Sequence, residues 1–240
     1  PRLRQSAQGY VVIGSGKTGM DACLWLLEHG VEPDDIRWIM PRDAWMLPRE
    51  YAQPDDAFFT GTFGNQANQF EAIAEATSVD DMYARLDEKG CVVRFDTNVE
   101  PTMFHAATIS KPELEVLRRI KNIVRMGRVT ALEPNRIVLE DGEIETGPEQ
   151  MHIDCSASLA RAIERMSPKP VFEGDVITPQ TIRSFMPVFS GSMIAYVEAN
   201  YQDEAEKNKL CSVVPAPNTS DDFVTMTLAA MLNQYNWSQD

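Results

Sequence analysis

The chain has 240 residues, of which 43% are hydrophobic, so it can bury the core of one domain with a smaller addition. Its formal net charge of −14 argues against nucleic acid, whose phosphates would be repelled. No apolar stretch is long enough to span a bilayer, no signal-peptide pattern opens the sequence and the four cysteines lack a metal-binding spacing, so we expect a cytoplasmic protein with no membrane contact and no metal.

The first predicted elements are a strand over residues 10–13 and a helix over residues 17–29. Between them lies Gly14-x-Gly16-x-x-Gly19, the dinucleotide-binding fingerprint in its strand–turn–helix setting. The first glycine permits the tight turn, the second lets the backbone approach a pyrophosphate, and the third lets the helix pack on its strand. Because the helix start carries unpaired amides and a positive dipole end, it favours an anion. The predicted cofactor-binding residues of this turn are Gly14, Ser15, Gly16, Lys17, Thr18 and Gly19.

A second strand, predicted over residues 36–40, completes a βαβ unit and ends beside an arginine. A carboxylate about 20 residues beyond the fingerprint selects NAD, whereas an arginine there accommodates the 2′-phosphate of NADP. Arg42, preceded by Pro41, occupies this place, and its planar guanidinium can hold a phosphate through paired hydrogen bonds. The sequence therefore predicts NADP(H) as cofactor, with Lys17 and Arg49 as further cations nearby.

Other ligands fit this segment less well. Gly16-Lys17-Thr18 is similar to the end of a triphosphatase phosphate loop, but Val11 stands where that loop needs a glycine. A methyl donor such as S-adenosylmethionine usually calls for a carboxylate where this chain has Pro41-Arg42. NAD stays open as an alternative to NADP, because a small change in the strand ending would bring the Asp43 carboxylate to the selecting position.

The two segments resemble the NADPH-binding part of flavin-containing and Baeyer-Villiger-type monooxygenases. The similarity covers residues 14–21, Gly-Ser-Gly-Lys-Thr-Gly-Met-Asp, and residues 36–49, in which an arginine is soon followed by tryptophan and proline. In that family the arginine meets the 2′-phosphate, which is the role that the resemblance gives to Arg42. Residues 152–157 are similar to the Asp-Cys-Thr-Gly ending of the family's dinucleotide region, with Ser156 and Ala157 in place of the threonine and the glycine.

The middle of the chain is predicted to be a helical insertion over about residues 68–122. Ser110 and Glu113 have the spacing of a capping box, which marks the start of its last helix. The predicted segments are a turn-rich stretch, two helices, a strand and a further helix: residues 52–66, 68–76, 79–89, 92–95 and 111–121. We expect an aromatic cluster here to be plain core rather than the lining of a pocket: Phe58, Phe59, Phe63 and Phe70.

After this insertion the chain returns to short strands and then becomes helical again. Asp141-Gly142 predicts a hairpin turn, because both residues accept positive backbone angles. Helices are predicted over residues 188–208 and 220–235, the second capped by Thr219 or Ser220. One face of the last helix is apolar enough to require a partner: Phe223, Met226, Leu228 and Ala230.

None of the three histidines has the spacing of a catalytic group, so the catalytic residues stay unassigned. His29 ends a helix, His105 is expected in a loop after Phe104, and His152 alternates with apolar residues on a predicted strand, which favours structural roles. In the family that the chain resembles, reduced flavin does the chemistry, so protein acid–base groups are not required.

Together these patterns predict an α/β protein with two parts: a Rossmann-type NADP-binding domain with a parallel sheet over residues 1–157, and a mainly helical appendage over residues 158–240. The chain departs from the family in having one glycine turn and no phenylalanine-glycine-histidine-tryptophan motif before it. We therefore expect the C-terminal portion of a longer NADPH- and FAD-dependent oxidoreductase acting on a small-molecule substrate. Alone, it would be inactive and would self-associate as a homo-oligomer through the face left by a missing FAD-binding domain. A non-catalytic NADP-binding sensor or scaffold and a flavin-independent dehydrogenase remain alternatives.

Overall fold

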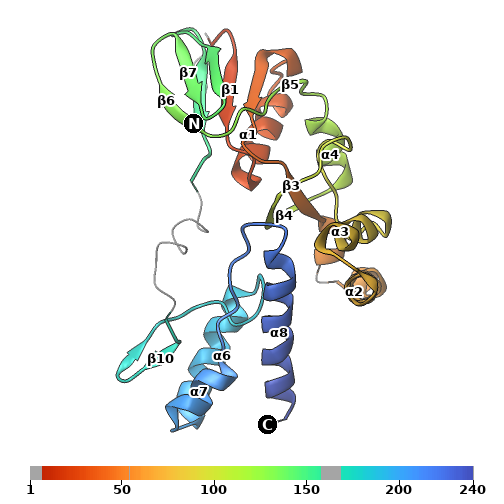
Figure 1. The fold of residues 1–240 in the computed structure, drawn as a ribbon, viewed down its shortest axis with the longest axis vertical. Coiled ribbons are helices and arrows are strands. Elements are labelled where there is room, and N and C mark those ends of the chain that lie inside the picture. Colours follow the sequence, from red (N-terminus) through yellow and green to blue (C-terminus); the bar gives the residue numbers. More distant parts are fainter. Residues whose placement is uncertain (1–6, 54, 158–168, 240) are drawn as a thin grey trace. The chain divides into compact units, whose positions relative to one another are not determined.

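A computed structural model describes residues 7–53, 55–157 and 169–239 of the chain. These residues form two compact units, Pro1–Ala157 and Ser158–Asp240. The first unit contains a four-stranded parallel sheet with the strand order β5-β2-β1-β9 (Figure 1). Its strands are β1 (Tyr10–Ile13), β2 (Ile36–Ile39), β5 (Asn122–Val124) and β9 (Met151–Asp154). The predicted α/β class and the parallel sheet are therefore confirmed.

The continuous apolar sequence of β1 is explained by cover on both faces of the sheet. Tyr10 and Val12 belong to a core shared with helices α1 (Lys17–Glu28) and α4 (Lys111–Leu117). Val11 and Ile13 point to the other face, where they pack against an antiparallel three-stranded meander. Parallel strands buried on both faces are typically apolar throughout, so β1 is held where its end can position the turn that follows.

The meander consists of β6 (Val129–Leu132), β7 (Arg136–Leu139) and β8 (Gly142–Glu145). The predicted hairpin between β7 and β8 is present, with Glu140 and Asp141 as its two connecting residues. Gly142 has a φ of 150° and already belongs to β8, so the turn lies one residue earlier than the sequence suggested. The hairpin was thus predicted correctly, but the positive φ expected at both turn residues is present at Gly142 and not at Asp141.

The middle of the chain is a mixed structure, and three predictions about residues 52–122 are wrong. Strand β4 (Met103–Ile109) lies within the range predicted as a helical insertion, residues 68–122, and pairs in parallel with β3 (Ala44–Pro48), which precedes that range. The turn-rich stretch forms most of helix α2 (Asp56–Glu75), because Asp55 accepts a hydrogen bond from the Ala57 amide and caps a helix instead of closing a loop. Residues 92–95 form no strand, since only the bridge between Met46 and Val93 is present there.

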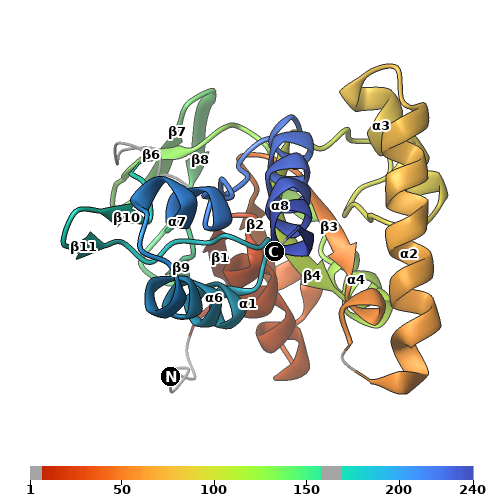
Figure 2. The same cartoon turned by 90° about the horizontal axis from the view of Figure 1, so that it is seen from below.

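Helix α2 lies beside α3 (Val79–Glu88) in both views (Figures 1 and 2) and buries little of its own surface. Ala72 is its one buried residue among those that the structure describes. The four phenylalanines expected in the core are instead 40% to 60% exposed: Phe58, Phe59, Phe63 and Phe70. The expectation of a plain aromatic core is therefore wrong, and these side chains form an exposed apolar stripe on α2.

The second unit is mainly helical, with a small hairpin of β10 (Phe172–Glu173) and β11 (Val176–Ile177). The helix predicted over residues 188–208 is two helices, α6 (Pro187–Asn200) and α7 (Glu204–Leu210), because Tyr201 is extended and Asp203 caps a new helix. The last helix is α8 (Asp222–Ser238). Three of the four residues predicted for its apolar face are buried, but Leu228 is 54% exposed on another side of the helix.

Within the described parts of the chain, no helix combines the length and the apolar character needed to cross a membrane.

Candidate functional site

Two glycines of the fingerprint are required by the protein's own packing. Gly14 has a φ of 116°, and a Cβ there would lie 2.6 Å from the Cys155 carbonyl oxygen. A Cβ on Gly19 would overlap the carbonyl oxygen of Gly14, because the first turn of α1 lies directly against the end of β1. Any side chain at these positions would push the helix away from the sheet.

Gly16 is different, because no contact among the described residues requires a glycine there. Its φ of −76° and ψ of 179° are accessible to any residue, and a Cβ would have no atom within 4 Å. A glycine whose absent side chain leaves open space is the form that close approach by a ligand would need.

Helix α1 begins at this open position without a cap of its own. Gly16 is the N-cap residue, no side chain accepts from its free amides, and the first turn contains no acidic residue. The other α-helices described in the same unit, α2, α3 and α4, each have a side-chain cap and an acidic first turn. The start of α1 therefore keeps unpaired donors and an uncompensated dipole end, which attract an anion.

Side chains from the sheet hold the turn in place and bring Arg42 beside it. The buried Trp38 donates from Nε1 to the Gly14 carbonyl oxygen at 2.8 Å. Ser15, itself buried, donates from Oγ to the Arg42 carbonyl oxygen at 2.6 Å. The turn and the segment after β2 thus form one connected structure. Sequence reasoning missed Trp38, whose only signal was an aromatic residue on the core-facing side of a strand.

The remaining predicted residues occupy varied environments. Thr18 is exposed, whereas Pro41 and Arg42 are half-buried. Lys17 forms an ion pair with Asp21 one turn along α1, so its charge is partly compensated within the helix. Arg49 lies elsewhere, because its guanidinium pairs at 2.9 Å with Glu113. That carboxylate also completes the capping box at α4, which confirms the predicted box and gives Arg49 a structural role.

Asp43 is the residue whose carboxylate left NAD as an alternative cofactor, and the structure buries it. Its residue exposure is 6%, and its carboxylate pairs with Arg125, which donates from Nε at 2.8 Å and from Nη2 at 3.0 Å. The hydrogen bonds to Asp43 hold the pKa of the Arg125 guanidinium above its usual value. Sequence reasoning missed Arg125, because no local pattern links two residues that stand 82 positions apart.

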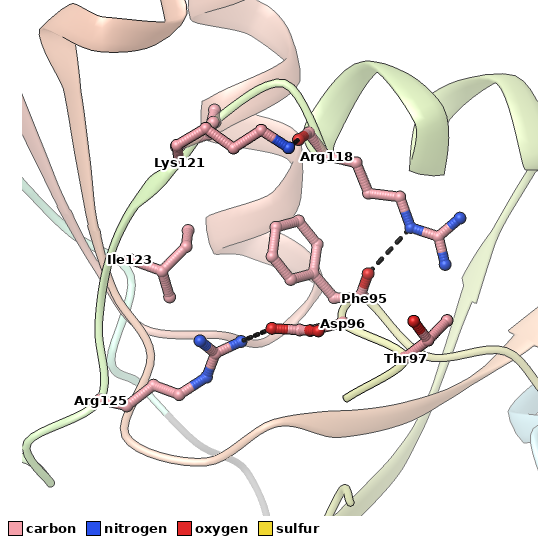
Figure 3. Close-up of a pocket in the computed structure, with 8 residues that line it drawn as sticks. Phe95, Asp96, Thr97, Arg118, Lys121, Ile123 and Arg125 are labelled. Atoms are coloured by element: carbon pink, nitrogen blue, oxygen red, sulfur yellow. Dashed lines mark hydrogen bonds and ion pairs between the residues drawn. The ribbon is translucent and has the colours of Figure 1, made fainter. Parts of the chain in front are cut away.

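Arg125 also lines a pocket of about 400 Å³ beside strand β5 (Figure 3). The pocket has apolar and basic walls, formed by Phe95, Asp96, Thr97, Arg118, Ile120, Lys121, Ile123 and Arg125. Arg125 pairs with Asp96 at 3.3 Å, Arg118 donates to the Phe95 carbonyl oxygen at 2.8 Å, and Lys121 donates to the Arg118 carbonyl oxygen at 2.6 Å. Since every cation of the pocket already has an acceptor, we assign these residues a structural role.

His29 and His152 make local contacts, whereas His105 lies on strand β4 and not in the expected loop. The Nδ1 atom of His29 lies 2.7 Å from the carbonyl oxygen of Trp25, on whose ring it stacks. The Nε2 atom of His152 lies 2.6 Å from Thr146 Oγ1, which donates to Gln150 at 2.8 Å. Among the described residues, no group of three or more histidine, cysteine, aspartate or glutamate side chains is placed to hold a metal ion.

The pKa of His152 gives one prediction for stability. Burial lowers it below its ordinary value of 6.5, so the folded chain binds a proton at His152 less readily than the unfolded chain does. Stability should therefore fall as the pH drops below 6.5, and the loss is complete below the folded-state pKa. In the His152→Gln variant this part of the decline should vanish, measured as a shallower slope of unfolding free energy against pH. Equal slopes for the two proteins would contradict the assignment.

Comparison with known proteins finds relatives of this chain in mycobacteria. Uncharacterized proteins of Mycobacterium bovis and of two Mycobacterium tuberculosis strains are each 44% identical over 231 residues, which is 96% of this chain. The chain spans 42% of the length of each of these relatives. No family model matches the chain, and no solved structure matches it significantly.

Proposed function

We propose that the chain is the NADP(H)-binding portion of a flavin-dependent oxidoreductase, monooxygenase-like in type, in which hydride passes from NADPH to FAD. The strand order β5-β2-β1-β9, with every pair parallel, matches the 3-2-1-4 order of a Rossmann half-sheet and supports a Rossmann-type domain. The candidate turn lies at the carboxyl end of β1, where open α/β sheets bind their ligands.

The observation that carries this proposal is the open space at Gly16. Packing accounts for the other two glycines, whereas at Gly16 packing gives no such reason and the close approach of a ligand would give one. The uncapped start of α1 supplies amides that would donate hydrogen bonds to a diphosphate, and a positive dipole end that would attract it. The residues present therefore fit a dinucleotide.

Arg42 would hold the 2′-phosphate of the cofactor. Its carbonyl oxygen accepts from Ser15, which keeps this residue next to the diphosphate turn. The pairing of Asp43 with Arg125 removes the carboxylate that would favour NAD, and so supports NADP. NADPH would supply a hydride, and this chain's part is to bind and orient the nucleotide.

FAD and the substrate site belong to the proposal for the whole protein, since the relatives are longer than this chain. An FAD-binding domain of the same polypeptide would be the partner that receives the hydride, and a small molecule would be the substrate. Exposed apolar residues on α8 are consistent with a covered face or with self-association as a homo-oligomer: Leu228, Met231, Leu232 and Tyr235. We place the protein in the cytoplasm, where NADPH chemistry and its free cysteines are compatible.

Arg42→Ala should weaken NADP binding about 10- to 100-fold while changing NAD binding little, because a charge-assisted bond to a phosphate contributes about 1.5–3 kcal/mol. Isothermal titration calorimetry with both nucleotides measures the change. Arg49→Ala is the matched control, since Glu113 holds that guanidinium, and it should leave both affinities unchanged. An Arg42→Ala variant with the wild-type NADP:NAD ratio would refute this role. If the longer, flavin-loaded protein bound NADP but did not oxidise NADPH, the non-catalytic alternative would be favoured.

A further inference from the structure

The end of β2 presents two side chains with opposite consequences for cofactor choice. Arg42 favours the 2′-phosphate of NADP, whereas a carboxylate in the same region would accept hydrogen bonds from the free ribose hydroxyls of NAD. Asp43 is adjacent to Arg42, so the orientation of Asp43 decides whether a carboxylate also faces the ribose.

The protein fixes that orientation with bonds to both the backbone and the side chain of Asp43. Its carbonyl oxygen accepts from the Thr102 and Met103 amides, each at 3.2 Å. Its two carboxylate oxygens accept from a single Arg125 guanidinium at 2.8 and 3.0 Å, and its side chain is only 5% exposed. A bidentate pair of this kind holds the carboxylate in one direction.

Arg125 is itself held in the place that this pairing requires. The Met40 amide donates to the Val124 carbonyl oxygen at 2.9 Å, so the ends of β2 and β5 lie side by side just before Asp43 and Arg125. On its other side the guanidinium pairs with Asp96 at 3.3 Å, across the end of the pocket in Figure 3. A hydrogen bond from the Asn98 amide keeps the pKa of Asp96 low, so this second acceptor stays charged.

We propose that Arg125 is a positioning residue for cofactor choice, which withdraws the Asp43 carboxylate from the ribose and leaves Arg42 to meet the adenosine end. This inference rests on the proposed function. It adds that the protein favours NADP in two ways: Arg42 supplies a cation, and Arg125 keeps the Asp43 carboxylate away from the ribose. The NADP:NAD affinity ratio is the appropriate measurement, because a loss of stability alone would not change it.

Four proteins test the inference by calorimetry with NADP and NAD: the 240-residue chain and its Asp43→Asn, Arg125→Met and Asp43→Asn/Arg125→Met variants. Arg125→Met should release the carboxylate and lower the ratio by about tenfold or more, the scale of one charge-assisted hydrogen bond gained by NAD and repulsion of the phosphate. The double variant, which has no carboxylate to release, should return the ratio to within about threefold of the wild type. Asp43→Asn alone should leave NAD affinity unchanged.

Arg118→Met is the matched control, because it removes a guanidinium from the same pocket that does not contact Asp43. Its ratio should equal that of the wild type. Asp43→Asn keeps one of the two acceptor oxygens that face Arg125. A tenfold loss of NAD affinity in this variant would overturn the inference even where Arg125→Met fails to fold. An unchanged ratio in folded Arg125→Met would also overturn it. A wild-type chain that binds neither nucleotide would refute the proposed function itself, whereas NADP binding with unchanged ratios would refute this inference alone.

Discussion

Gly19→Ala is expected to destabilise the first unit by more than about 4 kcal/mol, a loss that single substitutions cause only through severe steric or electrostatic disruption. The new methyl group would overlap the carbonyl oxygen of Gly14. That oxygen cannot move away freely, since it accepts from Trp38 and the amide of the same residue donates to Ile39. Helix α1 would have to separate from β1, which opens the core between them. Urea unfolding followed by tryptophan fluorescence measures the effect.

Gly64→Ala is the matched control for this substitution. Gly64 lies on the exposed side of α2, where an added Cβ meets no atom within 4 Å. Alanine at a helical glycine of this kind should raise stability by about 0.5–1 kcal/mol. If Gly19→Ala unfolded at the same urea concentration as the wild type, the close contact between α1 and β1 would be refuted.

Arg125→Met is expected to reduce the free energy of unfolding by about 3 kcal/mol, because it leaves a buried carboxylate without its cation. Asp43 is 6% exposed, so without Arg125 its carboxylate either stays buried without these hydrogen bonds or turns out of its packed position, and both lower stability. Restoring neutrality with Asp43→Asn in the double variant should recover most of the loss. Chemical denaturation of the wild type, both single variants and the double variant gives the coupling between the two side chains.

Arg136→Met provides the contrast on the surface. Arg136 makes two ion pairs at 2.8 and 3.0 Å, distances that resemble those of Arg125, but both of its carboxylate partners are well exposed. Solvent can hydrate those partners after the substitution, so stability should change far less than in Arg125→Met. Equal losses for the two variants would show that burial of Asp43 has no special effect.

The parts of the site that the sequence predicted depend on local patterns. A buried strand, a turn with defined glycine spacing and an amphipathic helix are all encoded within residues 10–28, and each lies where it was expected. The capping box at Ser110 is equally local, although the helix that it starts ends at Leu117 instead of reaching residue 121. Such features need no knowledge of the rest of the fold.

The parts that the sequence could not predict depend on contacts between distant segments. The pairing of Arg125 with Asp43 joins the ends of two neighbouring strands, and β4 becomes a strand only because β3 is available to pair with it. Helix α2 was missed for a different reason. Its Gly61 and Gly64 resemble turn signals, but an exposed helix with a capped start tolerates both. Local signals of this kind are weaker than the tertiary context.

Calorimetry of NADP binding to the wild type and to Gly16→Ala tests the central claim most directly. Gly16 has ordinary backbone angles and open space around it, so the variant should lose no more than about 1 kcal/mol, the cost of alanine at the N-cap of α1, and should stay folded. Its new methyl group would lie where the diphosphate approaches, and the loss of one charge-assisted bond should weaken binding roughly 10- to 100-fold. A wild-type chain that gives no binding heat with NADP or NAD, or a Gly16→Ala variant that binds NADP as tightly as the wild type, would contradict the account.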